Sequence, residues 1–118
     1  MKIITHPAQL KAAGEPVKII SEFIGKVNSA TDDISIAKMI SPEGWSEPGQ
    51  TPAFIEYTII LKGVLVIETK QGKYELKSNQ AVLIEKDEWV KYSTPYKGGA
   101  EYIAICRPAF STERVLRD

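Results

Sequence analysis

A chain of 118 residues with 43% hydrophobic and 25% charged residues has the composition of one globular domain. Its 15 basic residues balance 15 acidic ones without a block of like charge, which argues against binding to nucleic acid or to an anionic membrane surface. No apolar run approaches the roughly 20 residues that span a bilayer. Pro7 interrupts the N-terminus too early for a signal peptide, and the single Cys106 allows no internal disulfide, so we expect a cytoplasmic protein.

The N-terminal residues carry the signals of a short helix. Thr5 or His6 can cap it, Pro7 suits its first turn, and Gly14 follows its end. We therefore predict a helix over residues 8–13. His6 is the only histidine of the chain, and its place beside the cap favours a capping or surface role over catalysis or metal binding.

The rest of the chain is a series of short apolar runs separated by Gly, Pro and Asn turns. The predicted strands are 17–20, 23–24, 34–40, 54–61, 64–69, 73–76, 81–84, 89–94 and 101–107. Tight turns are expected at 62–63, 71–72 and 78–79, and the polar tail 111–118 can form one helical turn. This pattern indicates a single all-β domain over residues 1–118, either a jelly roll or an immunoglobulin-like sandwich.

A glycine-rich loop and the strand after it, residues 44–63, carry the most specific spacing in the chain. This stretch resembles the first signature of the cupin superfamily, which runs glycine, five residues, two His one residue apart, three residues, Glu, six residues, glycine. Gly44, Glu56 and Gly63 fall on the glycine, Glu and glycine of that signature. The two His positions fall on Gln50 and Pro52.

The stretch 79–94 matches the second cupin signature in its spacing but not in its residues. Its Gly, Pro, Gly, His and Asn places are taken by Asn79, Glu85, Asp87, Val90 and Thr94. Asn and Asp tolerate the left-handed backbone that glycine usually supplies, so the two turns can survive the replacements. The resemblance implies a cupin jelly-roll β-barrel, a double-stranded β-helix, here with the short N-terminal helix.

The resemblance also defines where a cupin would hold its metal. Family members usually use the two His and the Glu of the first signature and the His of the second, which here are Gln50, Pro52, Glu56 and Val90. Proline and valine offer no donor atom, and an amide oxygen is a weak ligand for a transition metal. We therefore expect no metal site and no cofactor.

Strand alternation combined with the resemblance maps the lumen of the barrel. The residues expected to point inward are Ala37, Met39, Gln50, Pro52, Glu56, Thr58, Ile60, Val90 and Tyr92, with Trp45 at the mouth. An apolar pocket with a few polar groups is typical of a small-molecule site, and equally of a filled barrel core. The candidate ligand-binding residues are Trp45, Met39, Gln50, Glu56, Val90 and Tyr92.

Glu56 is the candidate for chemistry, with Tyr92 as its partner. Burial among apolar residues would raise the pKa of Glu56 unless Tyr57, Tyr92 or Gln50 donates a hydrogen bond to it. Near the end of the last strand, Cys106 is expected to be a buried, hydrophobic-like thiol. We expect its neighbour Arg107 to form an ion pair across the sheet.

Three functions fit these features. The leading hypothesis is a metal-free cupin barrel that binds a small, partly apolar molecule as a carrier, sensor or accessory protein. The second is a metal-independent isomerase or lyase that uses Glu56 with Tyr92, and the balance between the two leans against an enzyme. The third is a scaffold that only forms homodimers, because Ile36 and Ile40 are expected to face outward. We expect a homodimer under all three hypotheses.

Overall fold

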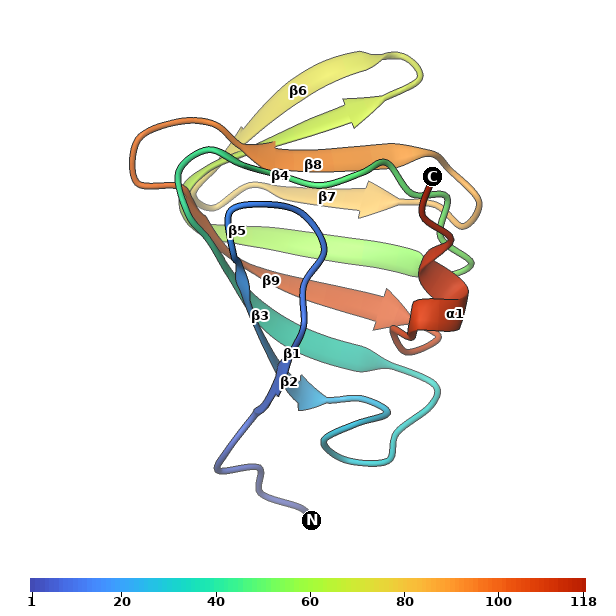
Figure 1. Ribbon diagram of the computed structural model, residues 1–118. Helices are drawn as coiled ribbons and strands as arrows, with labels where there is room; N and C mark the ends of the chain where they lie inside the picture. Colours follow the sequence, from blue (N-terminus) through green and yellow to red (C-terminus); the bar gives the residue numbers. More distant parts are fainter.

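The computed structural model describes residues 1–118 and consists almost entirely of antiparallel strands (Figure 1). Its elements in chain order are β1 (Ala8–Leu10), β2 (Ile19–Ile24), β3 (Ser35–Ser41), β4 (Trp45–Ser46), β5 (Ile55–Thr69), β6 (Gly72–Lys77), β7 (Ala81–Ile84), β8 (Val90–Thr94), β9 (Ala100–Arg107) and the short helix α1 (Thr112–Val115).

The strands form two sheets that share the long strand β5. The first sheet has the order β1-β2-β3-β9-β5-β7 and uses the N-terminal half of β5. The second sheet has the order β4-β8-β5-β6 and uses the C-terminal half of β5. The sheet curls so that the two parts face each other, as a jelly-roll barrel requires (Figure 1).

One continuous strand replaces the two strands predicted at 54–61 and 64–69. The register against β9 shifts between Ile60 and Lys62, and Gly63 bends the chain with φ of +78°. A Cβ atom at Gly63 would lie 2.1 Å from the carbonyl oxygen of Gly99, so only glycine allows this close approach. The predicted turn at 62–63 is therefore a bulge and a bend that pass β5 from one sheet to the other.

The predicted N-terminal helix is wrong. Ala8–Leu10 is the edge strand β1, which pairs antiparallel with β2, and the Gln9 side chain donates a hydrogen bond to Ser21 Oγ at 2.9 Å. A helix of six residues is too short to be stable by itself, so pairing with an open sheet edge decides the conformation. His6 is exposed and contacts only Thr5 and Asn28 through hydrogen bonds.

Several local predictions are confirmed. β7 has the predicted bounds, the chain turns tightly between β5 and β6, and the C-terminal tail forms one helical turn, α1. Asn79 and Asp87 adopt positive φ values of 69° and 66°, as expected for residues that stand where the cupin signature has glycine.

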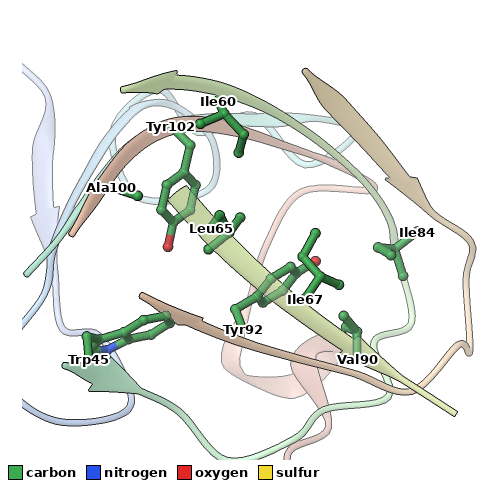
Figure 2. Close-up of a cluster of buried hydrophobic side chains, with 9 residues drawn as sticks. All are labelled: Trp45, Ile60, Leu65, Ile67, Ile84, Val90, Tyr92, Ala100 and Tyr102. Atoms are coloured by element: carbon green, nitrogen blue, oxygen red, sulfur yellow. The ribbon is translucent and has the colours of Figure 1, made fainter. Parts of the chain in front are cut away.

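The main hydrophobic core lies between the two sheets. Nine buried side chains form it: Trp45, Ile60, Leu65, Ile67, Ile84, Val90, Tyr92, Ala100 and Tyr102 (Figure 2). A smaller cluster of Phe54, Cys106 and Val115 packs under α1, which therefore covers one end of the barrel. The helix of the chain is far too short and polar to cross a membrane.

Candidate functional site

A cavity of about 60 Å³ lies inside the barrel, between the inner face of the first sheet and β8. Of the 20 residues that line it, 11 are hydrophobic. Its apolar wall includes Ile20, Ala37, Met39, Ala104 and Phe110. The polar groups that line the same space are Lys11, Lys18, Glu22, Ser35, Glu47, Gln50, Glu56, Thr58, Tyr92, Tyr102, Cys106 and Arg117.

The strand register orders these groups along the barrel axis. Glu56 pairs with Cys106 and Cys106 with Ser35, which together form one end of the inner face. Two residues further along each strand, Thr58, Ala104 and Ala37 form a small-residue row. Side chains two residues apart on a strand point to the same face. The small-residue row therefore forms an apolar floor between the polar end at Glu56 and the opposite end of the sheet.

Glu56 is buried, and its carboxylate is held by two neighbours. The Tyr92 hydroxyl donates to Oε1 at 2.5 Å, and the Cys106 thiol lies 3.6 Å from Oε2. Burial raises the pKa of Glu56, and the hydrogen bond from Tyr92 and the charge of Lys18 offset part of that rise. Tyr92 is therefore the hydrogen-bond donor among the three candidates that the sequence offered.

The two partners of Glu56 are held in their neutral forms. Burial and the neighbouring Glu56 raise the pKa of the Tyr92 hydroxyl and of the Cys106 thiol well above their ordinary values. Tyr92 therefore acts as a hydrogen-bond donor, and Cys106 is the buried thiol that the sequence predicted.

Arg107 differs from its prediction. Its side chain points away from the cavity, is exposed, and donates to the Tyr57 hydroxyl at 3.2 Å. None of the four ion pairs in the structure includes it. The predicted ion pair is wrong because the residue opposite Arg107 in the register is Ile55, which carries no charge.

A second polar group, Glu47 with Arg117, was missed by the sequence analysis. Arg117 Nη1 lies 3.4 Å from Glu47 Oε1, yet Glu47 Oε2 and Arg117 Nη1 have no hydrogen-bond partner although both are buried. Burial raises the pKa of Glu47, and the charges of Lys18 and Arg117 offset part of the rise. Glu47 lies in a proline- and glycine-rich loop and Arg117 in the polar tail, so no periodicity placed them inside.

Lys18 was also missed, and it is the buried cation of the cavity. Its Nζ donates to the Tyr102 hydroxyl at 3.2 Å and lies 4.1 Å from the centre of the Trp45 ring. Tyr102 in turn shares a hydrogen bond of 2.8 Å with Ser41. A signal was present in the sequence, because Lys18 alternates with the inward-facing Ile20 in the run that leads into β2.

Four of the six predicted ligand-binding residues line the cavity, namely Met39, Gln50, Glu56 and Tyr92. The other two, Trp45 and Val90, lie in the hydrophobic core and do not reach the cavity (Figure 2). Trp45 was expected at the mouth, but it is fully buried, and its Nε1 donates to the Ala13 carbonyl at 3.1 Å. The segment after β1 covers Trp45, with Ala13 and Gly14 beside the indole nitrogen, and Ala13 belongs to the stretch that was predicted as a helix.

The residues at the cupin metal positions do not fit a metal ion. Gln50 and Val90 pair through their main chains, with both N–H···O distances at 2.9 Å, and Pro52 is buried beside them without a donor atom. The carboxylate of Glu56 is engaged by Tyr92 and Cys106. No group of three or more His, Cys, Asp and Glu side chains is placed to hold a metal. We derive no chemistry through a metal at this site.

Comparison with solved structures identifies the fold of this chain. An RmlC-like cupin with a double-stranded β-helix fold from Methanocaldococcus jannaschii aligns over 89% of this chain and 93% of its own, with a TM-score of 0.69 and 14% identity. The chain therefore has the cupin fold, a double-stranded β-helix, as its two signature stretches predicted.

Two further structures share the fold at similarly low identity. A Streptomyces PAC13 variant with uridine aligns over 95% of this chain and 84% of its own, with a TM-score of 0.71 and 10% identity. The EutQ protein of Clostridium difficile aligns over 79% of this chain and 64% of its own, with a TM-score of 0.66 and 20% identity. At these identities the structures show the fold and nothing further.

Sequence comparison finds a curated relative of a different description. The chain is 36% identical over 96 residues to the Endoribonuclease YbeY of Myxococcus xanthus. The alignment covers 81% of this chain and 33% of that protein. The chain thus spans about a third of the length of the curated relative that it matches. No family model matches the chain.

Proposed function

We propose that this protein binds a small, partly apolar molecule in the barrel cavity and acts as a carrier, sensor or accessory protein. The observation that carries the proposal is a cavity with a largely apolar wall into which buried, incompletely paired polar groups project. Buried polar atoms in proteins nearly always have hydrogen-bond partners. Glu47 Oε2 has none within the protein, and Arg117 Nη1 has only the ion pair with Glu47 Oε1 at 3.4 Å, so both atoms have capacity for a polar group of a ligand.

One of the structures that share the fold supports a small molecule in the barrel. The PAC13 variant, which has the same fold, is described with uridine. The relative from Myxococcus xanthus is described as an endoribonuclease, but this chain corresponds to only a third of it. The charge balance of the chain offers no basic surface for RNA. We therefore do not extend ribonuclease activity to this protein, and we propose one cytoplasmic cupin domain over residues 1–118.

Mass spectrometry of the purified protein tests the proposal. We expect a small molecule that accompanies the native protein and is released on denaturation. The matched control is Ala37→Phe, which places a larger apolar side chain on the cavity wall and should exclude the molecule while preserving the fold. The proposal fails if the native protein carries nothing and its melting temperature does not respond to any compound in a broad metabolite screen.

A second function is favoured by one feature, the buried Glu56 with Tyr92. A carboxyl group whose pKa is raised by burial, held 2.5 Å from a tyrosine hydroxyl, can transfer protons in an isomerase or lyase. If the protein catalyses such a reaction, Glu56→Gln should lower the turnover number by about 10²-fold or more. If turnover survives this change, Glu56 serves binding or structure and the enzyme hypothesis is wrong.

A further inference from the structure

Lys18 is buried at one end of the cavity without an anionic partner. An ammonium group has three N–H donors, and the structure gives Nζ one acceptor, the Tyr102 hydroxyl at 3.2 Å. The faces of Trp45 and Tyr102, at 4.1 and 5.4 Å, stabilise the charge but accept no conventional hydrogen bond. None of the four ion pairs in the structure includes Lys18.

The acidic residues of the cavity are each committed to another group. Glu22 Oε2 accepts the main-chain N–H groups of Val27 and Asn28, both at 3.0 Å. Glu47 pairs with Arg117, and Glu56 accepts from Tyr92. Lys18 is therefore a buried cation of the cavity without an opposite charge in contact, whereas Lys11, which also lines the cavity, is exposed to solvent.

We propose that the molecule bound in the cavity is a small organic anion, a short-chain carboxylate, whose charged end contacts Lys18 and whose other end extends toward Glu56. This inference rests on the proposed function, because it names the class of ligand that the same cavity binds. A carboxylate offers Nζ the acceptors that it lacks, and a charge-assisted hydrogen bond of this kind is among the stronger ones.

Electrostatics in the cavity point the same way. Burial raises the pKa of both Glu47 and Glu56, and the charge of Lys18 offsets only part of that rise. Each carboxyl that remains neutral leaves the positive charges of Lys18 and Arg117 less balanced. An anion bound against the Lys18 ammonium meets a favourable local potential, because no carboxylate of the cavity forms an ion pair with that group.

The space between the two ends fits a short apolar chain. Thr58, Ala104 and Ala37 form the row next to Glu56, and Met39 continues the floor toward Lys18. A buried site needs about 10–15 Å³ per water-sized group, so the cavity of about 60 Å³ holds about four to six heavy atoms. That number matches a carboxylate with a chain of a few carbons.

Calorimetric titration with three four-carbon probes tests the charge of the ligand. Butanoate, butanamide and butylamine share one carbon chain and differ in charge at one end. We expect butanoate to bind at least about tenfold more tightly than butanamide, and butylamine to bind least. Binding of butylamine in preference to butanoate would overturn the proposal.

Variants at Lys18 assign the contact. Lys18→Met removes the charge and keeps an apolar side chain, so it should lower butanoate affinity at least about tenfold and leave butanamide affinity unchanged. Lys18→Arg should retain butanoate binding, which keeps the test valid if the Met variant is poorly folded. The matched control is Lys38→Met, in the neighbouring strand β3 but outside the cavity, which should bind butanoate as the native protein does.

The two proposals fail in distinguishable ways. If mass spectrometry finds a cationic or neutral molecule in the native protein, the ligand class is wrong while the binding function stands. If Lys18→Met and Lys38→Met bind butanoate equally, Lys18 is not its anchor and the inference is overturned. If no molecule accompanies the protein and none of the three probes binds, both the ligand class and the binding function are wrong.

Discussion

At the scale of single residues, the environment of Glu56 makes stability depend on pH in a defined direction. Its pKa is raised in the folded protein and ordinary in the unfolded chain, so folding favours the neutral carboxyl. The stabilising effect of that proton is fully present below the pKa that Glu56 has in the unfolded chain. It is lost as the pH rises through the pKa that Glu56 has in the folded protein. Ionised Glu56 is therefore the less stable form of the folded protein.

Replacement of Glu56 by Gln isolates this effect, because Gln keeps the shape and the acceptor for Tyr92 but cannot ionise. We expect Glu56→Gln to be at least as stable as the native protein at mildly alkaline pH, with its advantage shrinking as the pH falls. Urea unfolding of both proteins across a pH series measures the difference. A variant that is strongly destabilised at alkaline pH would show that Glu56 is ionised and paired in the folded state.

The residues at the cupin metal positions give a second prediction at this scale. The purified protein should contain well under one equivalent of iron, zinc or manganese by elemental analysis, because Pro52 and Val90 have no donor atoms. Val90→His alone should not create a tight zinc site, since Pro52 still contributes no ligand. Stoichiometric metal in the native protein, or tight zinc binding by Val90→His, would show that other side chains form a site.

At the scale of elements, the C-terminal segment after β9 closes one end of the barrel. The main-chain N–H of Thr51 donates to Leu116 and that of Asp118 donates to Gly49, at 3.0 and 2.9 Å. These bonds hold Arg117 in place against Glu47. A polar tail thereby supplies both the lid of the cavity and one of its charges.

Removal of Arg117 should therefore destabilise the fold through Glu47. We expect Arg117→Met to lower the free energy of unfolding by about 1–3 kcal/mol, between the values for exposed and fully buried ion pairs, because Arg117 is about one-quarter exposed and Glu47 is buried. Adding Glu47→Gln should recover part of the loss, since it removes the uncompensated charge. Chemical denaturation of the single and double variants measures the coupling, and strictly additive losses would contradict it.

At the scale of the whole molecule, the outer face of the first sheet is apolar. Ile19, Ile40, Ile59 and Leu83, from four different strands, are 46%, 37%, 44% and 49% exposed. Exposed apolar residues on one sheet face commonly mark a protein interface, and the register also places Lys38 and Glu101 on this face. The sequence placed Ile36 and Ile40 on this face, and the structure finds Ile36 half-buried and Ile40 exposed.

We predict a homodimer formed through this face. Light scattering at tens of micromolar should give about twice the chain mass of 13.1 kDa. Ile59→Lys should shift the protein to monomers, because a buried unpaired charge is costly at an apolar interface. Glu113→Lys, on the exposed side of α1, is the matched control and should remain dimeric. A native protein that is monomeric at this concentration would refute the prediction.

The sequence by itself determined the barrel and half of its site. The alternation of strand faces and the turns, which are local properties of the chain, indicated an all-β domain, and the resemblance of Gly44, Glu56 and Gly63 to the first cupin signature selected the cupin fold. The same alternation placed Met39, Glu56 and Tyr92 at the cavity. Local chemistry was sufficient wherever a residue sits inside a regular strand.

Only the tertiary structure decided the charged half of the site. Glu47 lies in an irregular loop and Arg117 in a polar tail, so no period reports which way their side chains point, and for Lys18, which precedes its strand, the alternation with Ile20 is the one local signal. Long-range pairing also turned residues 8–10 from a predicted helix into the edge strand β1, and the segment after it covers Trp45. At the ends of the barrel the chain lies in loops and tails outside the regular strands. There, contacts with segments far apart in sequence determine its conformation more than local propensity does.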